Sequence, residues 1–191
     1  MAYLLLVFSI NSFGGFAMSA ASGSVILITC VTNAGGFGPG HSALAINGTV
    51  YSFQETSNYG SSGSGWLVIG LDKYLSQNEE RPVILQELTS AVDSGKVLQY
   101  INKSRADDDD YATSGVCSSQ AASAIESGYS SSFNTWGIDK PYEIYQLAKD
   151  KGIVREETLT WPKRDSINKY KRNSCEWVLD KLYKGYSWML M

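Results

Sequence analysis

The sequence of 191 residues is poor in the residue types that build metal centres and disulfide scaffolds. It has three cysteines, Cys30, Cys117 and Cys175, which are far apart and include no Cys-x-x-Cys pair of the kind that binds zinc. Its single histidine, His41, excludes a site with several histidine ligands and any mechanism that needs two imidazoles. We therefore expect no metal or cofactor, and His41 and the cysteines are the first candidates for chemistry.

Charge is also scarce. Sixteen Lys and Arg face nineteen Asp and Glu, which gives a net charge of −3 with the histidine neutral. No basic tract is present, and this argues against nucleic acid as a partner because phosphate binding needs clustered Lys and Arg. No apolar run approaches the length of about 18 residues that a membrane-spanning helix needs, so we expect no integral membrane span. The length fits one domain with a substantial core.

The beginning of the chain lacks charge entirely, since Glu55 is the first charged residue. Residues 3–10 are an apolar stretch of signal-peptide length, and small residues follow it up to Ser22. The basic residue that usually precedes such a stretch is missing. Two interpretations stay open: residues 1–22 are an export signal, or they form the first buried strand of the fold. Residues 23–191 then form a single domain.

The clearest local pattern is a β-hairpin. Two strand-like runs flank Asn47-Gly48, a residue pair typical of a type I′ turn. Residues that lie directly opposite each other in such a hairpin point to the same face of the sheet. The turn predicts three cross-strand pairs: Ile46 with Thr49, Leu44 with Tyr51, and His41 with Gln54.

The other patterns indicate an α+β domain with an antiparallel sheet packed against helices. Apolar, β-branched runs predict strands at 24–32 and 81–88. Apolar periodicity, caps and glycine stops predict helices at 89–103, 117–128, 139–152 and 173–184. The glycine-rich segments 33–40 and 57–65 are expected to be loops. The acidic run 107–110 lacks the ligand spacing of a calcium loop and is expected to be solvated.

Cys117 is the only cysteine expected at the start of a helix. A cysteine attacks a carbonyl as its thiolate, and the free N–H groups and the dipole of a helix N-terminus favour that anion. We expect Ser114 or Gly115 to cap this helix, which places Cys117 in its first turn. Cys30 lies within an apolar strand, and Cys175 lies on a helix face with apolar neighbours. Cys117 is therefore the candidate nucleophile, although a lone cysteine among small residues is more often part of a core.

His41 is the candidate general base, because it begins a strand directly after a glycine-rich loop. Such a base needs a third group to orient its ring, and the side chain of Gln54 can form a hydrogen bond with the far ring nitrogen. Tyr111, six residues before Cys117, can donate its hydroxyl proton to the oxyanion that forms on the substrate. Each residue also has a plain structural interpretation, and it is their combination that favours catalysis.

Two segments carry a family resemblance. Gly40-His41-Ser-Ala-Leu-Ala-Ile-Asn-Gly-Thr-Val-Tyr-Ser-Phe and the later Tyr111-x5-Cys117-Ser-Ser-Gln-Ala-Ala-Ser-Ala-Ile resemble the circularly permuted NlpC/P60-like group of papain-fold proteins. This group includes bacterial cell-wall amidases, toxin-like effectors and lecithin:retinol acyltransferase-like enzymes. Its histidine hairpin precedes its nucleophile helix, as it does here. The segment that begins at Pro141 also resembles a Pro-x-x-(Ile/Leu)-Tyr motif of bacterial members, and the resemblance covers residues 24–150.

The resemblance implies a papain-like fold in which Cys117 is the nucleophile, His41 the general base and Gln54 the orienting group. The implied activity is cysteine-dependent hydrolysis of an amide bond, in a peptidoglycan amidase or endopeptidase or in an antibacterial effector. The implied partners are a peptide or peptidoglycan substrate and, for a toxin, an immunity protein. The implied location is secreted or periplasmic, or cytoplasmic before delivery by a secretion system.

Two other functions stay open. A lipid acyltransferase or thioesterase of the same fold would use the same nucleophile, with residues 1–22 as a membrane anchor if they are retained. A non-enzymatic binding module would hold Cys117 and His41 as structural residues. In an exported protein, Cys30 and Cys175 could pair in a disulfide and leave Cys117 free.

Overall fold

The computed structural model describes residues 23–30, 40–54, 65–79, 81, 83–107, 116–130, 133 and 140–160. Within these ranges the chain forms one antiparallel sheet with the strand order β4-β3-β2-β1-β5-β6. The strands are β1 (Val25–Cys30), β2 (His41–Ile46), β3 (Thr49–Phe53), β4 (Trp66–Gly70), β5 (Val83–Leu88) and β6 (Val154–Thr160). The helices are α1 (Leu71–Gln77), α2 (Ser94–Ala106), α3 (Cys117–Gly128) and α4 (Pro141–Asp150). The α+β class predicted from the sequence is confirmed.

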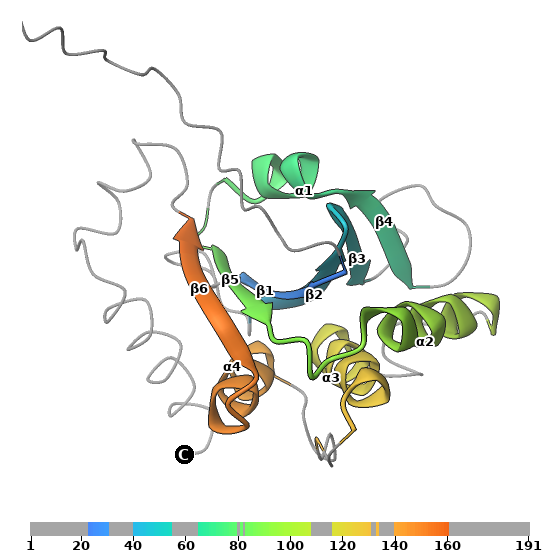
Figure 1. The fold of residues 1–191 in the computed structure, drawn as a ribbon. Coiled ribbons are helices and arrows are strands. Elements are labelled where there is room, and N and C mark those ends of the chain that lie inside the picture. Colours follow the sequence, from blue (N-terminus) through green and yellow to red (C-terminus); the bar gives the residue numbers. More distant parts are fainter. Residues whose placement is uncertain are drawn as a thin grey trace, which may run out of the picture.

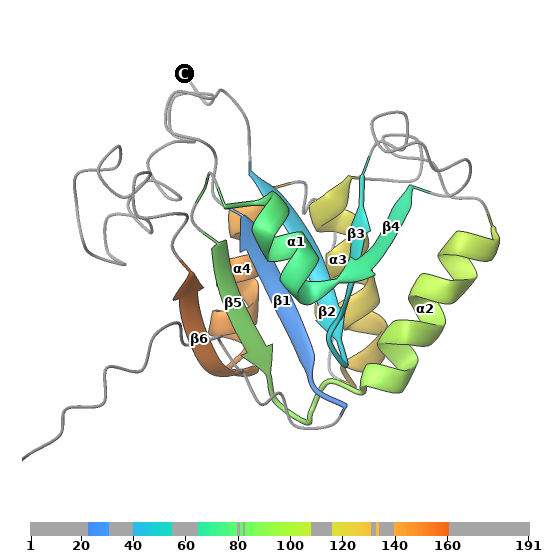
Figure 2. The same ribbon diagram turned by 90° about the horizontal axis from the view of Figure 1, so that it is seen from above.

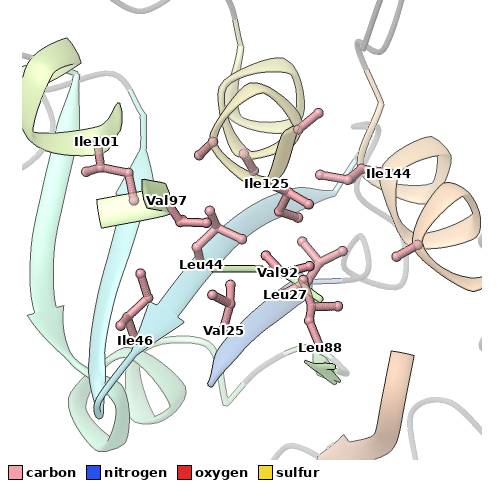
Figure 3. Packing of buried hydrophobic residues seen from close by; sticks show 14 of the residues in the cluster. Val25, Leu27, Leu44, Ile46, Leu88, Val92, Val97, Ile101, Ile125 and Ile144 are labelled. Carbon is pink, nitrogen blue, oxygen red and sulfur yellow. The ribbon is translucent and has the colours of Figure 1, made fainter. Parts of the chain in front are cut away.

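The helices cover both faces of the sheet. Helices α3 and α4 lie on one face, with α2 beside α3, and α1 lies on the other (Figures 1 and 2). We call these the α3 face and the α1 face. Leu44 and Ile46 of β2 point to the α3 face and pack with Ile125 and Ile144 in the larger core (Figure 3). The smaller core on the α1 face contains residues from β1, β2, β3, β5 and α1: Ile26, Ile28, Cys30, Ala43, Ala45, Val50, Tyr74, Val83 and Leu85.

Strand β1 is buried on both faces, which explains its sequence. Each of its six residues is buried, and a strand covered on both sides reads as a continuous apolar run rather than an alternating one. The prediction of a central strand within 24–32 is confirmed as far as Cys30, the last residue described there.

The hairpin is confirmed, and two of the three predicted pairs are observed, while the predicted pair of His41 with Gln54 lies beyond the paired residues. Asn47 and Gly48 have positive φ angles of 51° and 75°, as a type I′ turn requires. The cross-strand pairs are Ile46 with Thr49, Ala45 with Val50, and Leu44 with Tyr51.

Three elements have no counterpart among the sequence predictions. Strand β4 and helix α1 are short, and β6 reads Val-Arg-Glu-Glu-Thr-Leu-Thr. Strands β4 and β6 form the two edges of the sheet. Strand β4 is a short apolar run with Val68 40% exposed, whereas β6 is mostly polar. Their conformation is decided by pairing with β3 and β5 rather than by a pattern of their own.

Two helix starts differ from prediction for local reasons. Helix α2 begins at Ser94 rather than at residue 89, because the Asp93 carboxylate accepts hydrogen bonds from the backbone N–H groups of Gly95 and Lys96. Helix α3 begins at Cys117 as predicted, but its N-cap is Val116 instead of Ser114 or Gly115. The Ser119 hydroxyl accepts a hydrogen bond from the Val116 N–H at 2.8 Å, so the helix start needs no polar side chain at the cap position.

The remaining helix predictions are confirmed in part. Helix α4 spans Pro141–Asp150, slightly less than the predicted 139–152. The predicted helix at 173–184 and residues 1–22 lie outside the residues that the structure describes. None of the helices in the described part is long and apolar enough to cross a lipid bilayer.

Gly128 sits where the end of α3 meets the segment before α2, and this contact generates a stability prediction. A Cβ atom there would lie 2.7 Å from both the Asp93 carbonyl oxygen and a Val97 methyl group. We expect Gly128→Ala to lower the free energy of unfolding by about 1–3 kcal/mol, measured by urea denaturation. Gly70→Ala is the matched control, since a Cβ there meets nothing within 4 Å. Equal effects of the two substitutions would contradict this account.

Candidate active site

The Cys117 thiol lies between the first turn of α3 and strand β2. Cys117 is the first residue of α3 and is only 5% exposed. Small residues behind it, Ala121 and Ala122, are buried in the core and let the helix lie close to the sheet. The backbone N–H groups of Ser42 and Ser118 act on the Cys117 thiol and lower its pKa. Groups of both the helix and the strand therefore act on the thiol.

Burial and hydrogen bonding act on the thiol in opposite directions. Burial raises the pKa of Cys117, since a buried thiolate loses its hydration. The N–H donors of Ser42 and Ser118, the Ser118 hydroxyl and the positive charge of Arg81 lower that pKa, but the net direction is upward. A group that removes the thiol proton is therefore needed for the sulfur to act as a nucleophile.

His41 is held by a short polar relay on the α1 face. Its Nε2 atom lies 2.7 Å from the Ser52 hydroxyl oxygen, and that hydroxyl donates to Gln54 Oε1 at 3.2 Å. Because the hydroxyl proton is directed to Gln54, the oxygen of Ser52 accepts from His41 Nε2–H. This assigns the proton to Nε2 and leaves Nδ1 as the lone-pair nitrogen.

The imidazole is neutral in the folded protein. Burial lowers the pKa of His41 to about 3, and the Arg81 guanidinium acts in the same direction. An imidazole that is neutral and has a defined tautomer is in the form that a general base requires.

The side chains of His41 and Cys117 lie on either side of the peptide bond between His41 and Ser42 and are not in direct contact. The Ser42 N–H that lowers the pKa of Cys117 belongs to the peptide bond between His41 and Ser42. The two side chains approach this peptide from different sides, since His41 shares the α1 face with Ser52 and Cys117 lies on the α3 face. Among the described residues, no hydrogen bond joins the ring to the thiol.

Gln54 is linked to His41 through Ser52 rather than by the direct hydrogen bond expected from the sequence. Gln54 directly follows the last residue of β3, where the strand pairing has ended. Ser52 is a functional candidate that the sequence analysis missed. The hairpin register contained the signal, because it makes Ser52 the diagonal neighbour of His41 on the same face.

Cys30 lies beside His41 but in a core position. The two are cross-strand partners, and the Cys30 sulfur is 3.7 Å from the Tyr74 hydroxyl. Cys30 is fully buried, and burial raises its pKa. Cys30 is a free thiol in this structure, and Cys175, its conditional disulfide partner, lies outside the described residues. These surroundings are those of a packed residue rather than of a nucleophile.

Arg81 is the other residue that sequence reasoning missed. Its Nε atom donates to Asn78 Oδ1 at 2.9 Å, and its positive charge lowers the pKa values of Cys117 and His41. Arg81 is distant from both in the sequence, and no local pattern connects them. Tyr111 and Cys175 lie outside the described residues. In the part of the chain described, no three potential metal ligands gather in one place.

The single histidine makes one prediction directly measurable. We expect the imidazole NMR signals of His41 to titrate far below the usual pKa of about 6.5, near the value of about 3 set by burial. The urea-unfolded chain is the control and should titrate normally. Because the folded pKa is depressed, the resulting stability is present above pH 6.5 and is lost as the pH falls toward 3. A midpoint of 6 to 7 in the folded protein would refute the buried, neutral state.

Comparison of the chain with models of known protein families, with curated proteins and with solved structures finds no match. The case for a function therefore depends on the geometry around Cys117 and His41 and on the two motif segments that contain them.

Proposed function

We propose that the protein is a cysteine-dependent amide hydrolase with Cys117 as nucleophile and His41 as general base. The observation that carries the proposal is the position of the Cys117 thiol. It lies in the first turn of α3, where the backbone N–H groups of Ser118 and of Ser42, the residue after the only histidine, lower its pKa. The chain order, with the histidine hairpin before the cysteine helix, is that of the permuted NlpC/P60-like group.

The reaction begins with transfer of the thiol proton from Cys117 to Nδ1 of His41. The thiolate then attacks the carbonyl carbon of the substrate, and a C–S bond forms while the carbonyl oxygen becomes an oxyanion. As the C–N bond breaks, the imidazolium returns its proton to the leaving amine. Water, deprotonated by His41, hydrolyses the thioester and releases the acid and the free thiol.

The relay through Ser52 gives the imidazole its role in these steps. While Ser52 and Gln54 hold Nε2–H, the ring presents Nδ1 as its basic nitrogen. The ring and the Cys117 thiol lie on different sides of the peptide between His41 and Ser42, so proton transfer between them requires the ring to change its orientation. Catalytic hydrogen bonds are often long or poorly aligned until substrate binds.

The proposed substrate is an amide bond of a peptide, in the first place in the stem peptides of peptidoglycan. This choice comes from the resemblance to cell-wall amidases and effectors. Secretion or delivery to the periplasm, and an immunity protein in the case of a toxin, belong to the same proposal.

Replacement of the nucleophile is the primary test. We expect Cys117→Ala to abolish release of new amino groups from purified muropeptides, because no other described thiol lies at a helix start. Circular dichroism should be unchanged, since the substitution removes one sulfur atom. Cys30→Ala is the matched control at a buried cysteine on the other face and should retain activity. Full activity of folded Cys117→Ala would refute the proposal.

The same assay distinguishes amide hydrolysis from the alternative function, lipid acyl transfer. Phospholipid vesicles are tested beside muropeptides with the same variants. Loss of fatty-acid release in Cys117→Ala, with muropeptides left intact by the wild type, would assign the nucleophile to the acyltransferase reaction instead.

The hydrogen bonds that join His41, Ser52 and Gln54 lead to a second prediction. Ser52→Ala removes the acceptor that fixes the imidazole tautomer, so kcat should fall by about tenfold while KM stays within a factor of two. His41→Ala, which removes the base itself, should lower kcat by about 10² or more. Ser76→Ala, at an exposed helix serine, is the control. An unchanged kcat in Ser52→Ala would show that the relay has no part in the reaction.

A further inference from the structure

Arg81 lies at the end of the sheet that carries His41. Val83, the first residue of β5, pairs with Cys30, and Cys30 pairs in turn with His41, so these residues form a row across β5, β1 and β2. Two strand spacings, about 10 Å, separate the two ends of this row. Arg81 precedes Val83 by two residues, so the strand pairing brings it to the His41 end of the sheet.

The contacts of Arg81 place its guanidinium on the α1 side of this end. Its Nε and Nη2 atoms both donate to Asn78 Oδ1, and Asn78 is the C-cap of α1. Asn78 Nδ2 donates to the Tyr74 carbonyl oxygen at 2.8 Å. The Tyr74 hydroxyl lies 3.7 Å from the sulfur of Cys30, the cross-strand partner of His41. Helix α1 therefore fixes the guanidinium relative to the strand end that bears the imidazole.

Asn78 uses only part of the guanidinium. An arginine side chain has five N–H donors, and in Arg81 the Nε–H and one N–H of Nη2 are directed to Asn78. The other N–H of Nη2 and those of Nη1 include the pair that binds a carboxylate by two parallel hydrogen bonds. Arg81 is partly exposed, so a ligand can reach it.

The positive charge of Arg81 has no carboxylate partner in the part of the chain that the structure describes. The ion pairs there are formed by other cations, namely Lys103, Lys140, Lys149 and Arg155. The side-chain acceptor of Arg81 is the neutral amide of Asn78. A guanidinium that an amide holds in place, without a neutralising carboxylate, is an arrangement that suits an anionic ligand.

We propose that Arg81 is a specificity-determining residue that binds a carboxylate of the peptide substrate close to the amide bond that is cleaved. This rests on the proposed function and narrows its substrates to peptides with a side-chain or terminal carboxylate near the scissile amide. The carboxylate accepts two hydrogen bonds from the guanidinium, and this positions the amide carbonyl for attack by Cys117. Asn78 keeps the guanidinium in the orientation that the carboxylate needs.

Two alkylating reagents of similar size test the site without substrate turnover. Iodoacetate carries a carboxylate, and iodoacetamide is its neutral counterpart. Both react with the thiolate of Cys117, so the ratio of their rates does not depend on how much of the thiol is ionised. The Cys117 peptide is quantified by mass spectrometry. The same ratio in the urea-unfolded chain corrects for the intrinsic reactivity of the two reagents.

We expect the corrected ratio of iodoacetate to iodoacetamide to be about ten in the wild type, because charge-assisted hydrogen bonds hold the carboxylate beside the thiol. Arg81→Gln should reduce the ratio to about one, and Arg81→Lys, which keeps the charge but not the paired donors, should give an intermediate value. Arg105→Gln is the matched control and should keep the wild-type ratio, since it removes an exposed positive charge from the last turn of α2.

A second measurement uses the muropeptides of the hydrolase assay. One portion is coupled to excess ammonia with a carbodiimide, which converts its carboxylates to neutral amides. We expect the wild type to cleave the untreated portion with a kcat/KM about 10- to 100-fold higher than that of the amidated portion. Arg81→Gln should cleave both portions at the same low rate.

A ratio of alkylation rates that is equal in the wild type and in folded Arg81→Gln would overturn the inference, even in an active hydrolase. Equal cleavage of the two muropeptide portions by the wild type would also overturn it. A ratio that depends on Arg81, in a protein that cleaves neither portion, would reject the hydrolase function and keep Arg81 as a carboxylate-binding residue beside the thiol. The two failures are therefore distinguishable.

Discussion

The contact between the first turn of α3 and strand β2 is the constraint on which the site depends. It places the Cys117 sulfur against the N–H of the peptide that joins His41 to Ser42. The contact is possible because α3 is built of small residues and because the core of Leu44, Ile125 and their neighbours fixes the helix on the sheet. A bulky residue in this part of α3 would move the thiol away from the strand.

Burial at this position has opposite effects on the pKa values of the two candidate catalytic groups. It raises the pKa of the Cys117 thiol and lowers that of the His41 imidazole, so both groups are neutral at rest. An ion pair of thiolate and imidazolium is therefore not the resting state of this site. The N–H groups of Ser42 and Ser118, the Ser118 hydroxyl and the Arg81 charge lower the pKa of Cys117 in part, and Ser52 and Gln54 hold the imidazole ring.

Sequence patterns predicted the parts of the fold that are locally determined. The Asn47-Gly48 turn fixed the hairpin register, and the apolar run of β1 indicated a strand covered on both faces. The start of α3 at Cys117 was also predictable, although its cap was not, because Ser119 replaces the polar cap by a side-chain contact from within the helix. The edge strand β6 carries no apolar pattern and is determined by its pairing with β5, whereas β4 is an apolar run of only five residues.

The sequence alone determined which residues were available for chemistry: one histidine at a strand start, one cysteine at a helix start, and a turn that sets their polar neighbours. Only the tertiary structure decided how they meet. It placed Ser52 between His41 and Gln54, brought the Arg81 charge to act on both His41 and Cys117, and set the thiol and the imidazole on different sides of one peptide. These positions depend on how α3 and α1 pack on the two faces of the sheet, because that packing brings together residues that are far apart in the chain.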